Sequence, residues 1–308
     1  MVSKVLGAVG RLMVAAGLFL LGFVAFQLWG TGIQESNAQD SLVAGLVPAG
    51  DSDPSTVDPA AVAAQLGAVD PVTAPPLPPP PVGQPVGFIE IPAIELTRVV
   101  VEGVSKAELK QGPGHYPGTP LPGQPGNSGI AGHRTTYGAP FNRIDELVPG
   151  DSVVLTTPQG RFVYRVVPGP AGNGQAWYTV DPSDVSVLAD VGDDRVTLTA
   201  CHPKYSAELR IIVHAVLETP VAAAAPAPTV PTGVGEQAGA ASDADLGGDP
   251  DALLPAVAWG GAALLVAIGA WLLGRVWRPV PAYLLLTPVV LGMVWMCYTY
   301  LDRYLPAL

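Results

Sequence analysis

Three long hydrophobic stretches stand out along the 308-residue chain. The first covers residues 12–29 and is broken only by Gln27, so it is long enough to cross the hydrocarbon core of a bilayer as a helix. The other two, residues 253–273 and 280–298, are also of spanning length and are separated by a short connection. The pattern predicts an N-terminal membrane anchor and a C-terminal transmembrane helical hairpin. A cleaved signal peptide is the alternative for the first stretch, but the small residues at 36 and 38 lie well beyond a hydrophobic run that is long for such a signal.

Basic residues flank these stretches on one side. Lys4 and Arg11 precede the first stretch, and Arg275 and Arg278 lie in the connection between the other two. The positive-inside rule places these four residues in the cytoplasm, with Arg303 as the exception. The sequence therefore predicts a multi-pass protein of the cell membrane, whose chain between the first and second stretches is extracellular.

Two acidic tracts, residues 31–85 and 219–252, contain no Lys or Arg. They hold much of the negative charge behind the net −11, so the region between them is only mildly acidic. Nucleic acid is excluded as a partner, because phosphate binding needs a basic face. The first tract ends in a Pro-rich run that predicts an extended polyproline II spacer, and the second, Ala- and Pro-rich tract predicts a similar spacer. A Pro-rich ligand for a recognition module is the alternative.

Between these tracts, from residue 86 to 218, the pattern changes to short β-rich runs separated by Gly, Pro and Asp. Residues 105–110 and 141–147 have the pattern of short helical turns, whereas 112–126 is too rich in Gly and Pro for either state. Many short strands with few helices are typical of a sandwich or a closed barrel, so the fold class is mainly β. The predicted strands are 87–91, 98–101, 152–156, 161–167, 195–200 and 210–217.

The predicted organisation has six segments. A cytoplasmic tip with its transmembrane anchor is followed by an acidic Pro-rich linker and then by the folded domain. An Ala/Pro/Gly-rich acidic linker leads back to the transmembrane hairpin and a short extracellular tail. The bounds of these segments, in order, are 1–30, 31–85, 86–218, 219–252, 253–301 and 302–308.

Only two cysteines occur, Cys201 in the folded region and Cys297 inside a hydrophobic stretch, so no disulfide framework is predicted. An unpaired thiol in an exported domain is uncommon, because oxidising surroundings consume it, and this one indicates a chemical role. Cys201 ends a predicted strand, and Arg210 opens the next strand nine residues later. His133 ends a short apolar strand of its own. Together these residues offer what acyl transfer needs: a nucleophile, a proton carrier and a cation for the oxyanion.

The residues around this trio resemble those of a known family. His133 lies in the run Gly-His-Arg-Thr-Thr-Tyr-Gly-Ala-Pro-Phe, and Cys201 ends the run Thr-Leu-Thr-Ala-Cys. Arg210 then precedes an Ile-Ile-Val strand. These motifs, in this order, resemble those of sortases, most closely the class E type, over residues 86–218. The resemblance implies an eight-stranded sortase β-barrel and cleavage of a Leu-x-x-Thr-Gly-like sorting signal, of the Leu-Ala-x-Thr-Gly form in class E.

The resemblance also implies a role for each member of the trio. Cys201 would attack the carbonyl of the signal's Thr, and His133 would protonate the departing Gly amine. An incoming amine would then resolve the thioacyl enzyme, while Arg210 contacts the oxyanion or the peptide backbone. The chemistry is consistent, because a nearby cation favours thiolate over thiol.

Three further residues, Tyr137, Ala200 and His202, are candidates for lining the substrate pocket. Ala200 is also a departure from the family, since many sortases carry Thr immediately before the nucleophile. In this chain Thr199 is expected to point to the opposite face of the strand from Ala200. A hydroxyl near the thioacyl group is therefore expected to be missing.

No cofactor or metal is predicted. The remaining histidines have no metal-ligand spacing. Some sortases bind calcium through carboxylates in the loop before the catalytic His, but no acidic residue lies between Glu108 and His133 here. Calcium dependence is therefore not expected.

The partners that the resemblance implies are secreted proteins with a C-terminal sorting signal, a peptidoglycan precursor or other amine acceptor, and the lipid bilayer. Two alternatives to this wall-anchoring enzyme remain open. One is a sortase-fold protein that binds signals or scaffolds an envelope complex with weak catalysis, suggested by Ala200 and by the C-terminal hairpin. The other is a pilin-polymerising sortase, in which the accepting amine is a Lys of another protein.

Overall fold

The computed structural model describes residues 2–47, 58–225, 249–276 and 279–305. These residues form two compact units. The helical unit comprises Met1–Gly30 and Gly247–Ala307, and the β-rich unit comprises Thr31–Leu246.

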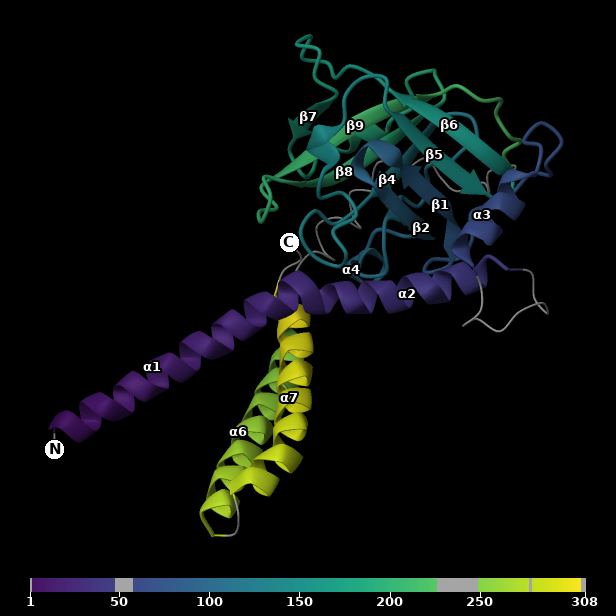
Figure 1. The fold of residues 1–308 in the computed structure, drawn as a ribbon. Coiled ribbons are helices and arrows are strands. Elements are labelled where there is room, and N and C mark those ends of the chain that lie inside the picture. Colours follow the sequence, from purple (N-terminus) through teal and green to yellow (C-terminus); the bar gives the residue numbers. More distant parts are fainter. Residues whose placement is uncertain (1, 48–57, 226–248, 277–278, 306–308) are drawn as a thin grey trace. The chain divides into compact units, whose positions relative to one another are not determined.

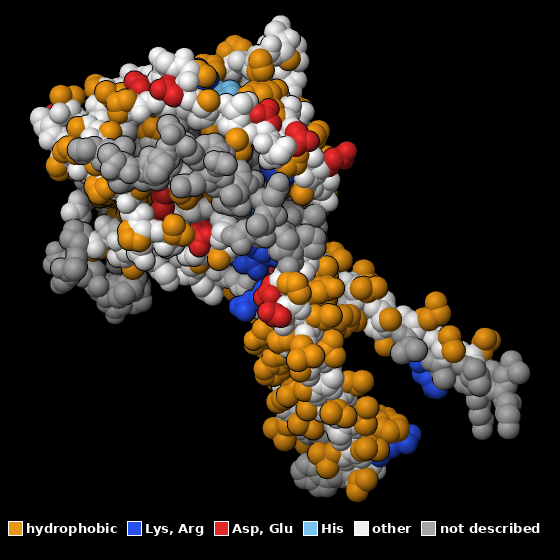
Figure 2. Space-filling view, turned by 180° about the vertical axis from the view of Figure 1, so that it is seen from behind, with side chains coloured by type: hydrophobic (Ala, Val, Ile, Leu, Met, Phe, Trp, Pro, Cys, Tyr) orange, Lys and Arg blue, Asp and Glu red, His pale blue; other side chains and the backbone are white. Residues whose placement is uncertain are grey.

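Three long apolar helices make up the helical unit (Figure 1). They are α1 (Val2–Ala25), which continues into the π-helical turn η1 (Phe26–Gly30), α6 (Leu253–Val276) and α7 (Pro279–Tyr304). Their lengths and compositions suffice to cross a membrane, and hydrophobic side chains cover α6 and α7 in Figure 2. The chain is therefore membrane-associated. Because α7 extends to Tyr304, residues expected in a short tail are still helical.

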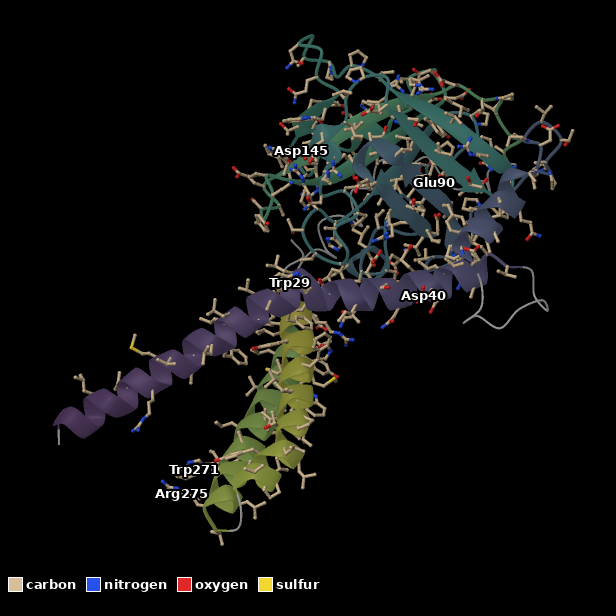
Figure 3. The ribbon with its side chains drawn as sticks, viewed as in Figure 1. Trp29, Asp40, Glu90, Asp145, Trp271 and Arg275 are labelled. Atoms are coloured by element: carbon tan, nitrogen blue, oxygen red, sulfur yellow. The ribbon has the colours of Figure 1, made fainter. Side chains whose placement is uncertain are left out.

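Aromatic packing and one hydrogen bond join α1 to α7. The Tyr298 hydroxyl donates to the carbonyl oxygen of Phe19 at 2.8 Å, and the two rings lie 5.0 Å apart. Gly22 permits this approach, because a Cβ there would lie 2.6 Å from the Tyr298 hydroxyl. At the other end of the hairpin, Arg275 lies 4.0 Å above the ring of Trp271, as both labels in Figure 3 show.

The β-rich unit is a closed barrel. Eight strands pair in the order β6-β5-β1-β2-β3-β4-β8-β9, and β6 also pairs with β9, which closes the ring. A ninth strand, β7, adds to the edge of β9. The bounds are β1 (Pro85–Ile91), β2 (Leu96–Glu102), β3 (Gly114–His115), β4 (Asn127–Ala131), β5 (Ser152–Thr157), β6 (Gly160–Val166), β7 (Trp177–Val180), β8 (Arg195–His202) and β9 (Leu209–Leu217).

Alternating side chains from these strands fill the barrel interior. Residues of β1, β5, β6, β8 and β9 meet there in one hydrophobic cluster, which explains why the strand pattern of the sequence alternates. Gly123 passes directly over the ring of Phe162, where a Cβ would lie 2.3 Å from the nearest ring carbon. The largest fully buried apolar members are Phe141, Phe162, Tyr164, Ile89, Ile91, Leu121, Ile130, Ile144, Leu147, Leu155 and Leu198.

The mainly β fold with short helices is confirmed. All six predicted strands are present with bounds shifted by at most two residues, and short helices form at α4 (Lys106–Leu109) and η4 (Ile144–Glu146). The sequence missed β3 and β7, because β3 has two residues within a Gly/Pro-rich loop and β7 has four.

The tract 31–85 differs from the extended spacer that was expected. It contains α2 (Thr31–Gly45) and α3 (Pro59–Gly67), and both helices contact the barrel strands. The helix α3 starts at an Asp58 cap followed by Pro59, a favoured start signal. Most of the second predicted spacer, 226–248, lies outside the described residues.

The segments that enter and leave the barrel are fastened together. Leu77 and Ala224 form a β-bridge. The side-chain amide of Gln159 donates to the carbonyl oxygens of Pro75 at 2.9 Å and Ala223 at 2.8 Å, one on each segment. The chain therefore enters and leaves the barrel at the same place.

Candidate active site

Neighbouring strands hold Cys201 opposite Arg210. The two residues are direct partners in the antiparallel register of β8 with β9, and only the turn after His202 separates the strands. The thiol is unpaired and half-buried. The Arg210 guanidinium donates to the carbonyl oxygen of Ala207 at 3.1 Å, which fixes it at this end of the strand pair.

The thiol of Cys201 lies in an environment with opposing effects. Burial raises the pKa of Cys201, and the positive charges of Arg210 and Arg134 partly offset that rise. The neutral thiol is therefore favoured at rest. The two cations are placed to stabilise negative charge when it develops on sulfur.

His133 reaches the same end of the sheet from another strand. Because β4 runs parallel to β8, Ala131 pairs with Thr199, and the amide of Gly132 donates to the Thr199 carbonyl at 3.0 Å. Two residues beyond Ala131, the chain is at the level of Cys201, two residues beyond Thr199. The structure therefore places His133, Cys201 and Arg210 at one end of three adjacent strands, with the His133 side chain buried.

Arg134, which directly follows His133, is a buried cation that sequence reasoning missed. It connects the loop after His133 with the strand end that carries Cys201. Its side chain is only 2% exposed, and it donates to Nδ1 of His202 at 2.8 Å and pairs with Asp145 at 2.8 Å (labelled in Figure 3). Although burial opposes it, the hydrogen bond and charge of Arg134 hold the pKa of Asp145 below its usual value. A guanidinium can only donate, so Nδ1 of His202 is the acceptor of this hydrogen bond. The basic residue directly after His133 was the available sequence signal.

A narrow groove beside the thiol has Tyr116 and Thr199 on its wall. The Tyr116 hydroxyl and the Thr199 hydroxyl are 3.0 Å apart, and burial raises the pKa of Tyr116, so its proton is retained. The groove encloses about 30 Å³. Its lining residues come mainly from β7, β9 and the segment around η5 (Val185–Leu188): Tyr116, Val180, Pro182, Asp184, Val185, Val187, Leu188, Thr199, Arg210 and Ile212.

None of the three residues suggested for the substrate pocket is part of this lining. Ala200 is 4% exposed and belongs to the barrel core, because it faces inward while Thr199 and Cys201 face the other side of β8. Tyr137 is buried, with its ring centroid 5.3 Å from that of His133. His202 is half-buried, with its ring 5.7 Å from the ring of Trp177.

The loop after His133 has an unusual backbone. Tyr137, Gly138 and Ala139 are consecutive residues with positive φ values of 50°, 70° and 44°. A left-handed φ costs an L-residue other than Gly about 1–2 kcal/mol. Tyr137 and Ala139 therefore need surrounding contacts to hold them in place.

The other histidines have structural partners. His115 is fully buried in β3, where Nδ1 pairs with Glu102 at 2.7 Å and Nε2 lies 3.0 Å from the carbonyl oxygen of Pro120. His214 lies on β9 with Thr197 at 2.9 Å from Nδ1 and Tyr178 at 2.8 Å from Nε2. Among the described residues, no group of three His, Cys, Asp or Glu side chains is placed to hold a metal ion.

His214 gives the barrel a dependence on pH. Burial, and to a lesser degree the charge of Arg195, lower the pKa of His214 from 6.5 to about 4. Between pH 6.5 and 4, His214 is protonated in the unfolded chain but stays neutral in the folded barrel. The free energy of unfolding therefore falls as the pH drops from 6.5 towards 4. The loss is at most about 3.5 kcal/mol, at about 1.4 kcal/mol per pKa unit.

Denaturant unfolding of the wild type and of His214→Gln at several pH values measures this effect. The variant should lack the part of the pH dependence between 6.5 and 4, while both proteins keep the carboxylate-driven loss at lower pH. Parallel curves over that range would show that His214 does not titrate as described.

Comparisons with known proteins agree with this geometry. The family model for the sortase domain matches residues 89–218. Sortase SrtE1 of Streptomyces coelicolor is 31% identical over 229 residues, covering 67% of this chain and 55% of that protein. Sortase D of Bacillus subtilis is 29% identical over 193 residues, covering 62% of this chain and 86% of that protein. The solved structure of sortase E from Streptomyces avermitilis is 37% identical, with a TM-score of 0.39, and covers 45% of this chain and 90% of that one.

The chain spans about half the length of SrtE1. The region that matches the family model contains the motifs around His133, Cys201 and Arg210, and it corresponds closely to the closed barrel. The chain therefore contains a sortase domain, at residues 89–218, and is similar to sortases of class E.

Proposed function

We propose that this protein is a membrane-anchored cysteine transpeptidase that cleaves a sorting signal and transfers the cleaved protein to an amine. The observation that carries the proposal is the register of β8 with β9, which sets Cys201 directly opposite Arg210. His133 joins them through the parallel pairing of β4 with β8. The location of all three inside the sortase domain supports the assignment.

The proposed reaction proceeds in two acyl transfers. The thiol of Cys201 gives its proton to His133 as its sulfur attacks the carbonyl carbon of the signal's Thr. The Thr–Gly amide bond then breaks, and His133 passes the proton to the departing Gly amine. Arg210 faces the negative charge that develops on the carbonyl oxygen. An incoming amine then attacks the thioester and gives a proton to His133, the carbon–sulfur bond breaks, and His133 passes the proton to the departing sulfur to restore the thiol.

The groove beside the thiol supports a signal of the Leu-Ala-x-Thr-Gly form. The hydrogen bond between Tyr116 and Thr199 closes one wall, and little space remains next to Arg210. A small side chain such as Ala fits such a wall better than a bulky one, because a tightly packed site does not accept extra volume without strain.

The cellular setting is part of the same proposal. The basic residues near the hydrophobic helices support a barrel outside the cell, with the domain bounds proposed from the sequence. The substrates are secreted proteins with a C-terminal sorting signal. The acceptor is the amino group of a peptidoglycan precursor, and such a precursor is itself bound to the membrane.

Peptide cleavage by the full chain tests the function. The protein in detergent micelles is incubated with a quenched Leu-Ala-x-Thr-Gly peptide, under reducing conditions, with and without hydroxylamine or a glycine amine. We expect cleavage, conversion of the Thr end into the hydroxamate or the Gly conjugate, and slower turnover of a peptide with Phe in place of the signal's Ala. No cleavage by folded, reduced protein would leave a signal-binding scaffold as the function.

A further inference from the structure

We propose that the helix α2 is a positioning element of the active site, which holds the strained loop 137–139 and through it the His133 ring. This inference rests on the proposed function for its catalytic consequence. The segment that forms α2 was expected to be part of an extended spacer. It is instead helical, and it contacts the barrel strands β1 and β2. Because α2 directly follows α1 and η1 in sequence, the N-terminal segment of the chain both carries the apolar helix and completes the site.

The first turn of α2 contacts the loop itself. Thr31 is fully buried, and its hydroxyl oxygen accepts a hydrogen bond from the backbone amide of Tyr137 at 3.0 Å. One turn later Glu35, 2% exposed, packs against Gly138, where a Cβ would lie 2.6 Å from the carboxylate. Glu35 is held there by its ion pair with Arg98 on β2, at 2.7 Å.

The later turns fix the helix to β2. The Gln39 side-chain amide accepts from the amide of Val99 at 2.7 Å and donates to the carbonyl of the same residue at 3.0 Å, as a neighbouring strand would. Leu42 and Val43 then pack with Val101 and its neighbours in a separate hydrophobic cluster. Residues 31, 35, 39 and 42 recur at helical spacing, so one face of α2 makes all of these contacts.

The loop transmits these contacts to His133. Tyr137 has a left-handed backbone, and its amide donates to the Thr31 hydroxyl, while the amide of Ala139 closes a tight turn onto the carbonyl of Thr136. The Tyr137 ring lies 5.3 Å from the His133 ring, and the amide of Phe141 closes the loop onto the His133 carbonyl at 3.0 Å. A shift of the loop therefore moves the imidazole.

The groove beside the thiol is built from other elements. Its lining comes from β7, β8, β9, η5 and Tyr116, and none of the lining residues belongs to α2 or to the loop 137–139. Loosening α2 should therefore impair proton transfer by His133 while leaving signal binding intact. A purely structural role would instead disturb both, because it would destabilise the barrel as a whole.

Variants of the full chain in detergent micelles test this inference. Thr31→Val keeps the shape but removes the acceptor, and Thr31→Ser keeps the acceptor. Gly138→Ala disturbs a second contact between α2 and the loop, because it places a methyl group against the Glu35 carboxylate. Asp40→Ala, an exposed position on the same helix (labelled in Figure 3), is the matched control.

We expect kcat for the Leu-Ala-x-Thr-Gly peptide to fall about tenfold in Thr31→Val and in Gly138→Ala, with KM changed less than about twofold, because a small misplacement of a catalytic group mainly slows the chemical step. Thr31→Ser and Asp40→Ala should behave like the wild type. Backbone amide hydrogen exchange, followed by mass spectrometry, should be about tenfold faster in the peptide that contains Tyr137 of Thr31→Val, and unchanged in the barrel strands.

The two measurements separate the possible failures. Unchanged exchange around Tyr137 would overturn the contact with α2, and faster exchange with unaltered kcat would overturn its catalytic role. Equal losses in Thr31→Val and Thr31→Ser would also overturn it, because the hydroxyl acceptor would then be irrelevant. If the wild type itself does not cleave the peptide, the proposed function fails and the catalytic part of the inference fails with it, whereas the exchange data still decide the contact.

Discussion

Replacing Cys201 with Ala should abolish peptide cleavage, with kcat/KM lower by at least about 10⁴, because loss of a covalent nucleophile leaves only binding and electrostatic stabilisation. No other thiol of the β-rich unit can take its place, since the second cysteine, Cys297, lies in α7. The measurement is the initial rate with the quenched peptide. Mass spectrometry of the wild type stopped during turnover should also show the thioacyl enzyme, and the variant should not form it.

The matched control for this variant is Cys297→Ala. It removes the other thiol of the chain and should leave the rate unchanged. The Ala side chain at 201 sits at a half-buried strand end, so the variant barrel should keep its thermal transition close to that of the wild type. Retained cleavage in folded Cys201→Ala would remove the central claim of the mechanism.

Replacing Arg210 with Ala should lower kcat/KM by about 10², or about 2.7 kcal/mol of transition-state stabilisation, as for loss of an oxyanion donor. The loss has two physical causes that act together. The charge that faces the developing oxyanion disappears, and the pKa of Cys201 rises further because Arg210 is the main positive charge that opposes its burial. The rates of cleavage and of thiol alkylation, measured against pH, distinguish the two contributions.

Arg165→Ala is the control for removal of a guanidinium, since Arg165 makes an exposed ion pair with Glu218 on the far part of the same sheet. That variant should be neutral, because exposed pairs add little to stability. Arg210→Lys should recover part of the activity, since it restores the charge without the forked donor geometry. Full activity in Arg210→Ala would assign the oxyanion contact to another group, and Arg134 is then the candidate because it is the other cation that acts on the thiol.

The sequence predicts the strands well where alternation is long. The ranges that form β1, β5, β8 and β9 were recognised because each buries alternate residues in the barrel interior. Their partners were not predictable, since β4 pairs in parallel with β8 across more than sixty residues of chain. The proximity of His133 to Cys201 therefore came from the resemblance to sortases and not from the pattern.

The tract 31–85 shows where composition misleads. Its acidic and polar residues favour a solvated spacer, yet Glu35 and Gln39 face the barrel and find partners there. Such a face is visible only once Arg98 and Val99 are in place, because the helix is stabilised by tertiary contacts more than by its own propensity. The position of Ala200 in the barrel core was not predictable for a related reason, since the face of a strand that points inward depends on the register.

The fastening of the two chain ends at Leu77 and Ala224 has a mechanical consequence. The chain continues from both of these points into the flanking tracts, so movement of one tract relative to the other puts tension between the two segments. A tension applied between these segments acts first on the bridge and on the two hydrogen bonds of Gln159. Because the bridge joins the two segments directly, this tension is carried across the bridge before it reaches the ladders between β4, β8 and β9 that hold Cys201 and Arg210 in register.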